Sequence, residues 1–333
     1  MPLGLLCSFI LLLWGASAAA AAEGPVLSAR AGVLLEAHSG VLLLSQNGAE
    51  PLPPASTGKI LTALLALDLA PDLAQVYTVS PTAAAVGESS ADLRAGETLT
   101  MGELLRGALV HSGNDACFAI GEAVAGSEPL FVHWLNMKAA AMGAYSARLC
   151  NTNGLPAPEH RISAADLGMI AAAAMEKPDF AAIVGSRFTS LGQGENYRVF
   201  RNTNKLLWQE EQIIGVKTGT TEEAGPCLVA ACASGPALFI SVVLNSPDRY
   251  GESLALLHFG RDNFVLLDLV RAGQALAYAN DRLWRAETDL QVLVKREVLR
   301  GLSLRWLLPG DDGDCRMQLL DGEGKVLGEV RLC

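Results

Sequence analysis

The chain has 333 residues, of which 50% are hydrophobic and 18% are charged, so it can bury one large core plus a smaller one, and this composition excludes an intrinsically disordered chain. Its formal net charge is −10 and its sequence pI is near 5.0. It has no Lys/Arg-rich run. Because nucleic acids and anionic membranes require a basic surface, neither is expected as a main partner.

Residues 1–22 have the features of a secretory signal peptide. They carry no charged side chain, are apolar from Leu3 to Trp14 and end in small residues at 16–22. Signal peptidase requires such a hydrophobic core and small-residue ending. An uncleaved anchor is the alternative, since the segment approaches the ~20 residues that span a bilayer. We expect an extracytoplasmic protein, at the cell wall or the outer face of the membrane, with membrane contact only if this segment is not cleaved.

The first elements of the mature chain are predicted to be a hairpin and a buried helix. Apolar runs at 31–36 and 41–45 flank a polar turn, which is typical of a β-hairpin. After Ser56 the apolar residues are too dense for an exposed helix. We therefore predict a helix in the middle of the domain, with Ser56 in its first turn.

The middle of the chain is predicted to be helical. A Thr-x-x-Glu capping box at 100–103 opens a helix over 104–110. That helix ends in a turn at 112–114, and a helical pattern resumes over 116–124. A second capped start at Ser163 begins an Ala-rich helix.

Three strands are predicted next, at 213–218, 227–233 and 238–244, followed by a closing helix over 252–270. Strands at both ends of the domain with helices between them favour one antiparallel sheet. From residue 286 the sequence alternates apolar and polar residues, with turn clusters at 309–313 and 321–324.

The predicted fold class is therefore α+β. We expect a catalytic domain over 23–275 and a small β-rich domain over 286–333. Past the signal segment there are six cysteines, but no Cys-x-x-Cys pair, and the five histidines are scattered. No specific disulfide, no metal site and no cofactor are predicted.

Three motifs stand out by their order and spacing: Ser56-x-x-Lys59, Ser112-Gly113-Asn114 and Lys217-Thr218-Gly219. Ser112 follows Ser56 by 56 residues, and Lys217 follows Ser112 by 105 residues. Each motif alone is usually a capping serine, a turn or a strand end. Together, in this order, they indicate a serine acyl-transfer site. A Ser-His-Asp triad is a poor alternative, because neither serine lies in a Gly-x-Ser-x-Gly elbow.

These residue types suit acyl transfer. On a helix Ser56 and Lys59 share a face, and the serine hydroxyl needs an adjacent base. A lysine is a base only when neutral, so the pKa of Lys59 must fall from ~10.4, through burial and a second cation, here Lys217. Backbone N–H groups of Ser56 and Thr220 would bind the oxyanion. Gly219 would leave room for a substrate backbone.

From about residue 28 to 273 the sequence resembles the D-alanyl-D-alanine carboxypeptidases of the low-molecular-mass penicillin-binding proteins. The likeness is carried by the segments 54–60, 112–116, 153–155 and 215–221, with Ala224-Gly225 after the last. Asn153 stands where the family often has His. The C-terminal module matches weakly, and we expect no counterpart of the C-terminal amphipathic anchor that members of the family commonly carry.

The resemblance implies a penicillin-binding/β-lactamase-like domain, with an antiparallel sheet and a helical cluster. It implies removal of the terminal D-alanine from peptidoglycan stem pentapeptides through an acyl-enzyme on Ser56, with β-lactam antibiotics as covalent inhibitors. Lys59 would be the base, and Ser112 would pass a proton to the leaving amine. The residues implied or expected to bind substrate are Asn114, Lys217, Thr218, Gly219, Thr220 and Arg249.

Two rival functions share this site. A β-lactamase must deacylate penicillin quickly, and class A enzymes use a dedicated glutamate for this step. Here Ser-Gly-Asn replaces their Ser-Asp-Asn, and no Glu-x-x-Leu-Asn segment precedes Lys217. A catalytically inert penicillin-sensing or wall-binding module is the other rival, and the intact motifs argue against it.

Overall fold

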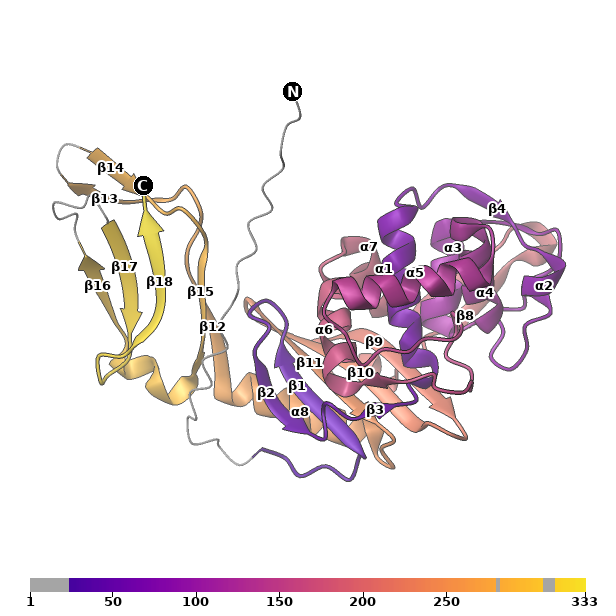
Figure 1. Ribbon diagram of the computed structural model, residues 1–333, viewed down its shortest axis with the longest axis horizontal. Helices are drawn as coiled ribbons and strands as arrows, with labels where there is room; N and C mark the ends of the chain where they lie inside the picture. Colours follow the sequence, from indigo (N-terminus) through magenta and orange to yellow (C-terminus); the bar gives the residue numbers. More distant parts are fainter. Residues whose placement is uncertain (1–23, 280–281, 308–314) are drawn as a thin grey trace.

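The computed structural model describes residues 24–279, 282–307 and 315–333. The molecule is elongated, with the helices and the largest sheet at one end and the C-terminal strands at the other (Figure 1). The predicted signal segment at 1–22 and the predicted turn at 309–313 lie outside the described residues. Within the described ranges, no helix combines the length and the apolar composition that a membrane span needs.

A five-stranded antiparallel sheet in the order β2-β1-β11-β10-β9 is the framework of the larger part. Strands β1 (Ala31–Glu36) and β2 (Leu42–Gln46) confirm the predicted hairpin. Strands β9 (Ile213–Thr221), β10 (Gly225–Ser234) and β11 (Ala237–Leu244) confirm the three later strands. Because β1 pairs with β11, both ends of this part build one sheet, as predicted.

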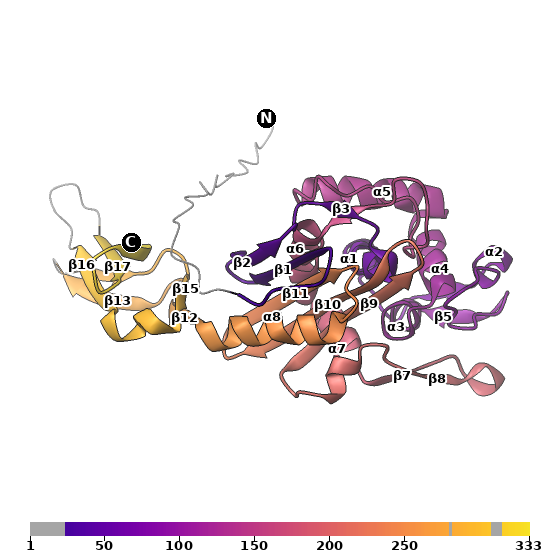
Figure 2. The same ribbon diagram turned by 90° about the horizontal axis from the view of Figure 1, so that it is seen from below.

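The sheet is covered on both faces. Leu35 of β1 packs into a core with α1 (Lys59–Leu69) and α6 (Ala164–Met175), whereas its neighbour Leu34 packs into a second core under α8 (Arg249–Asn263). Figure 2 shows α8 along one face of the sheet and α6 on the opposite side. Successive side chains of a strand alternate between faces, so both cores come from the same strands. All residues of β11 are buried.

Further helices complete the larger part, and the helix starts at Thr100 and Ser163 have the predicted side-chain caps. Short strands pair as β3-β6, β4-β5 and β7-β8. These helices are α2 (Pro81–Ala84), α3 (Met101–Arg106), α4 (Asn114–Ala125), α5 (Glu128–Ala141) and α7 (Pro178–Gly185). The short strands are β3 (Pro51–Leu52), β4 (Val76–Thr78), β5 (Thr98–Thr100), β6 (Ile162–Ser163), β7 (Phe188–Leu191) and β8 (Arg198–Arg201).

The C-terminal part is built from strands around its own small core, which includes Trp284, Met317 and Val330. Strand β12 pairs with β15, β13 with β14, and β17 lies between β16 and β18. The strands are β12 (Phe264–Val270), β13 (Ala275–Ala279), β14 (Arg282–Arg285), β15 (Leu290–Lys295), β16 (Ser303–Leu307), β17 (Cys315–Leu320) and β18 (Val326–Leu332).

The predicted closing helix over 252–270 is wrong beyond Asn263. Residues from Phe264 onward form β12, because their apolar side chains find a strand partner in β15 that local periodicity does not reveal. The domain boundaries stay a prediction. The predicted catalytic domain, 23–275, includes β12, which shares its sheet with β15 rather than with the five-stranded sheet, while Leu266 of β12 packs into the core under α8.

Candidate active site

Ser56 lies in a single 3-10 turn, η1 (Ala55–Gly58), that runs directly into α1. Lys59 is the first residue of α1, so one turn of backbone separates the two side chains. Its Nζ is 2.7 Å from Ser56 Oγ. Ser56 is half-buried and Lys59 is fully buried. The helix start predicted around Ser56 is confirmed, and it brings the hydroxyl and the amine into hydrogen-bond contact.

The Lys59 amine has two further acceptors. Its Nζ is 2.8 Å from Asn114 Oδ1 and 2.6 Å from the main-chain oxygen of Asn153. A neutral amine has two N–H bonds and one lone pair. If the Asn114 and Asn153 oxygens accept both N–H bonds, the lone pair is directed at the Ser56 hydroxyl. Burial lowers the pKa of Lys59 to about 8, although the nearby carboxylate of Asp115 opposes this shift.

Ser112 lies in the connection between α3 and α4, and Asn114 is the first residue of α4. One π-helical turn, η2 (Gly107–His111), ends α3, and the buried Ser112 follows in the left-handed conformation with φ 76°. Asn114 Nδ2 donates to the Gly87 carbonyl at 3.0 Å. With its amide nitrogen held in this way, Asn114 presents its oxygen to Lys59. The turn predicted at 112–114 thus places one side chain directly against the amine.

Lys217 lies on β9 and is almost fully buried. It pairs with Val229 of β10, whose side chain faces the core that contains α1. Burial, and then repulsion from the Lys59 ammonium, hold the pKa of Lys217 well below its usual value. We expected burial and the nearby Lys217 to lower the pKa of Lys59. Burial is the main cause of the lowered pKa at both lysines, and the charge of Lys59 lowers the pKa of Lys217 further.

Gly219 is the point where β9 touches the serine turn. A Cβ at Gly219 would lie 2.9 Å from the Ser56 nitrogen and 3.0 Å from the Thr57 nitrogen. Real Cβ atoms rarely approach backbone so closely. The expectation from sequence was that glycine makes room for a substrate. The structure gives a second reason for a glycine at this position, because a side chain here would push β9 away from Ser56.

Arg249, the first residue of α8, supports the end of β9. Its Nη1 donates to the Gly219 carbonyl and to Thr220 Oγ1, both at 2.8 Å. Thr218, between the buried lysine and this glycine, donates from Oγ1 to Thr203 Oγ1 at 2.7 Å. The structure therefore brings all the predicted site residues from β9 and α8 onto one edge of the sheet, beside Ser56.

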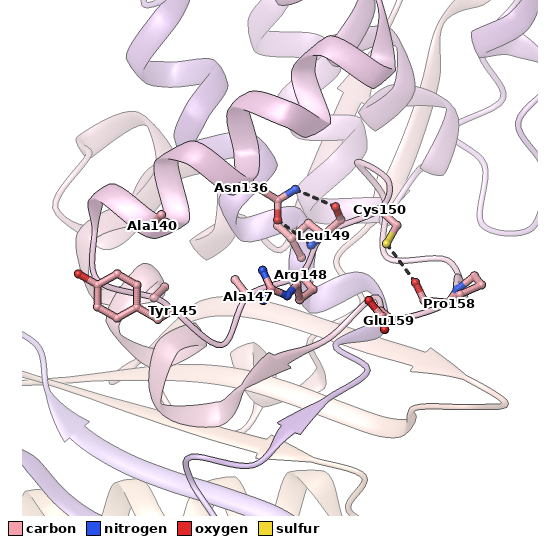
Figure 3. Close-up of a pocket in the computed structure, with 10 residues that line it drawn as sticks. Asn136, Ala140, Tyr145, Ala147, Arg148, Leu149, Cys150, Pro158 and Glu159 are labelled. Atoms are coloured by element: carbon pink, nitrogen blue, oxygen red, sulfur yellow. Dashed lines mark hydrogen bonds between the residues drawn. The ribbon is translucent and has the colours of Figure 1, made fainter.

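The Asn153 carbonyl is a site group that the sequence did not reveal. It lies in the segment between α5 and β6, whose outer side Figure 3 shows. There Asn136 of α5 accepts from Leu149 N at 2.9 Å and donates to Leu149 O at 2.8 Å. The Asn153 side chain accepts from Leu155 N at 3.0 Å. Because the main chain contacts Lys59, the motif pattern carries no signal for this contact, and the change from His to Asn leaves the contacting atom in place.

Comparison with known proteins gives consistent matches. A family model described as D-alanyl-D-alanine carboxypeptidase matches residues 18–248. The chain is 31% identical over 241 residues to D-alanyl-D-alanine carboxypeptidase DacF of Bacillus subtilis, a match covering 70% of this chain and 62% of that protein. It is also 31% identical over 313 residues to DacC of Escherichia coli, covering 86% of this chain and 76% of that one.

Among solved structures, penicillin binding protein 5 from Haemophilus influenzae has a TM-score of 0.79 at 25% sequence identity, covering 92% of this chain and 96% of that chain. This likeness confirms the predicted fold class. The chain spans less than two thirds of the length of DacF. The family model nevertheless matches more than half of the chain, and it includes all three motifs. The chain therefore belongs to the D-alanyl-D-alanine carboxypeptidase family.

Proposed function

We propose that this protein is a serine D-Ala-D-Ala carboxypeptidase that removes the terminal D-alanine from peptidoglycan stem pentapeptides. The observation that carries the proposal is the 2.7 Å contact between Lys59 Nζ and Ser56 Oγ. The amine in this contact is buried, with a pKa lowered to about 8. A base with a pKa near the working pH is what proton transfer from a serine hydroxyl requires.

Acylation begins when Ser56 Oγ attacks the carbonyl carbon of the penultimate D-alanine, while its proton moves to Lys59 Nζ. The negative oxygen that forms is bound by the N–H groups of Ser56 and Thr220, and each such donor contributes roughly 3 kcal/mol in the transition state. The C–N bond then breaks. Ser112 gives its hydroxyl proton to the leaving amine and regains one from the Lys59 ammonium. The products are the ester on Ser56 and free D-alanine.

The substrate's terminal carboxylate is bound by Lys217 and Thr218, with Arg249 as a helper. Asn114 holds Lys59 and the substrate amide. An incoming carboxylate favours the charged form of a buried lysine, so binding restores the ammonium of Lys217 that burial and Lys59 disfavour. In the second half of the reaction, water attacks the ester carbonyl and gives a proton to Lys59. The bond between the carbonyl carbon and Ser56 Oγ then breaks, and Lys59 returns the proton to Ser56 Oγ.

β-Lactams imitate the acyl-D-Ala-D-Ala end, so we propose that they acylate the same serine and act as covalent inhibitors. Peptidoglycan stem peptides are the proposed substrates. We also propose that the protein is exported and acts at the cell wall or the outer face of the membrane. This rests on the charge-free, apolar segment 1–22 with its small-residue ending.

The test is to incubate the protein and a Ser56→Ala variant separately with a stem pentapeptide and with penicillin. Release of D-alanine together with a long-lived penicilloyl adduct, both lost in the variant, supports the carboxypeptidase. Rapid loss of penicillin without release of D-alanine would indicate a β-lactamase instead. If neither substrate reacts, the protein is a binding module and the proposal is wrong.

A further inference from the structure

We propose that Glu128 is a positioning residue for Lys59, acting through Thr152 and the carbonyl of Asn153. The inference rests on the proposed function, because it concerns the orientation of Lys59 as the base of that reaction. Glu128 lies in the first turn of α5, and within the described part of the chain the hydrogen-bond partners of Lys59 Nζ are Ser56, Asn114 and Asn153 rather than Glu128.

Glu128 binds both hydrogen-bond donors of Thr152. Its Oε1 accepts from Thr152 Oγ1 at 2.8 Å and from Thr152 N at 3.1 Å. The carbonyl of Thr152 accepts from Thr62 Oγ1 of α1 at 2.7 Å. Thr152 and Thr62 are each 1% exposed. The N–H, hydroxyl and carbonyl of the buried Thr152 are therefore held from two helices, by the half-buried Glu128 of α5 and by the buried Thr62 of α1.

The next residue carries the contact with the base. The carbonyl of Asn153 accepts from Lys59 Nζ at 2.6 Å, and the turn after it is closed by a bond from Gly154 N to Asn151 Oδ1 at 2.8 Å. If Glu128 is lost, the buried donors of Thr152 have no acceptor, and the backbone must move to satisfy them. A rotation of this backbone carries the Asn153 carbonyl away from Lys59.

The consequence falls on proton transfer. With the oxygens of Asn114 and Asn153 taking its two N–H bonds, the neutral Lys59 amine directs its lone pair at Ser56. Without the Asn153 oxygen the amine can rotate, so its lone pair points at the Ser56 hydroxyl for a smaller fraction of the time. Binding of penicillin before reaction should change little, because the proposed carboxylate-binding residues lie on β9 and α8 rather than on this segment.

The experiment measures penicillin acylation by stopped flow for the full chain, giving the limiting rate constant and the half-saturating penicillin concentration. The variants are Glu128→Ala, Glu128→Gln and Thr152→Val. The Gln variant keeps an oxygen that can accept both bonds from Thr152, and the Val variant removes only the hydroxyl. Asp179→Ala is the matched control, because Asp179 is also acidic, also in the first turn of a helix, and exposed.

We expect Glu128→Ala to lower the limiting rate about tenfold or more, with half-saturation within about twofold of wild type. Glu128→Gln should recover most of the rate, Thr152→Val should fall between them, and Asp179→Ala should match wild type. Thermal unfolding checks that each variant is folded. If Glu128→Ala does not fold, the Gln and Val variants decide the question.

Two results would overturn the inference: a Glu128→Ala protein that acylates at the wild-type rate, or a Glu128→Gln protein as slow as Glu128→Ala. If Glu128→Ala does not fold, a Thr152→Val protein with the wild-type rate has the same meaning. Failure of the proposed function would look different, because the wild-type protein itself would then not be acylated.

Discussion

Changing the pH should change the rate at which Ser56 is acylated, because only the neutral form of Lys59 can accept the serine proton. The fully buried amine has a pKa lowered to about 8. Below that pH the amine is an ammonium with no lone pair for Ser56. The rate should therefore fall as the pH falls, and it should level off above the pKa.

The size of the effect follows from that value. With a pKa of about 8, the neutral fraction is roughly 1% at pH 6, one half at pH 8 and 90% at pH 9, since each pH unit below the pKa changes it about tenfold. The acylation rate should thus rise about 90-fold between pH 6 and pH 9. An unshifted lysine with a pKa of ~10.4 would still be mostly charged at pH 9.

The assay is the limiting first-order rate constant of acylation at saturating fluorescent penicillin, where the bound carboxylate keeps Lys217 charged, measured across this range under conditions where the folded state is verified by circular dichroism. Penicillin has no group that titrates between pH 6 and pH 9, so the profile reports on the protein. A flat profile, or one that keeps rising as though the base titrates near 10, would refute the assignment of Lys59 as a base with a lowered pKa.

Three further predictions follow from the site and its support. Gly219→Ala should abolish acylation, because the new Cβ would lie 2.9 Å from the Ser56 nitrogen; penicillin labelling at the wild-type rate would show that the strand can shift without cost. Arg249→Ala should weaken pentapeptide binding, seen as a KM raised several-fold, because the 2.8 Å bond to the Gly219 carbonyl is lost; an unchanged KM would remove Arg249 from the site. Glu252→Ala should lower the free energy of unfolding by about 2–4 kcal/mol in a urea titration, because this buried carboxylate accepts hydrogen bonds from Ser28 and other groups, and the acylation rate should stay the same; equal stability would show that these bonds contribute nothing.

Local patterns predicted the features that depend on local chemistry. The capping box at Thr100 specifies a helix start by itself, and the spacing of Ser56 and Lys59 on one turn specifies their contact. The strands of the central sheet were predicted because short, dense apolar runs between turn residues are typical of buried strands. The order of the three motifs then indicated one site, which the structure assembles from η1, the α3–α4 connection and β9.

Features that depend on distant partners were missed. Residues 264–270 form a strand only because β15 lies beside them, with paired residues 20 to 31 positions apart in the chain. The Asn153 carbonyl is a main-chain atom, so no residue type marks it. Burial and a second cation were both expected to lower the pKa of Lys59, but the sequence did not show that burial is the larger cause, because motif spacing does not show how deeply a side chain is buried. The burial of one side chain depends on how the surrounding elements pack, and the spacing of residues in the sequence does not specify this packing.

The central claim is that Ser56 is the nucleophile, and the most direct test is the mass of the protein after brief exposure to benzylpenicillin, followed by peptide mapping. We predict a mass increase equal to one penicillin, located on the peptide that contains Ser56, and no increase in the Ser56→Ala variant. An unmodified wild-type protein, or an adduct on a different residue, would contradict the account.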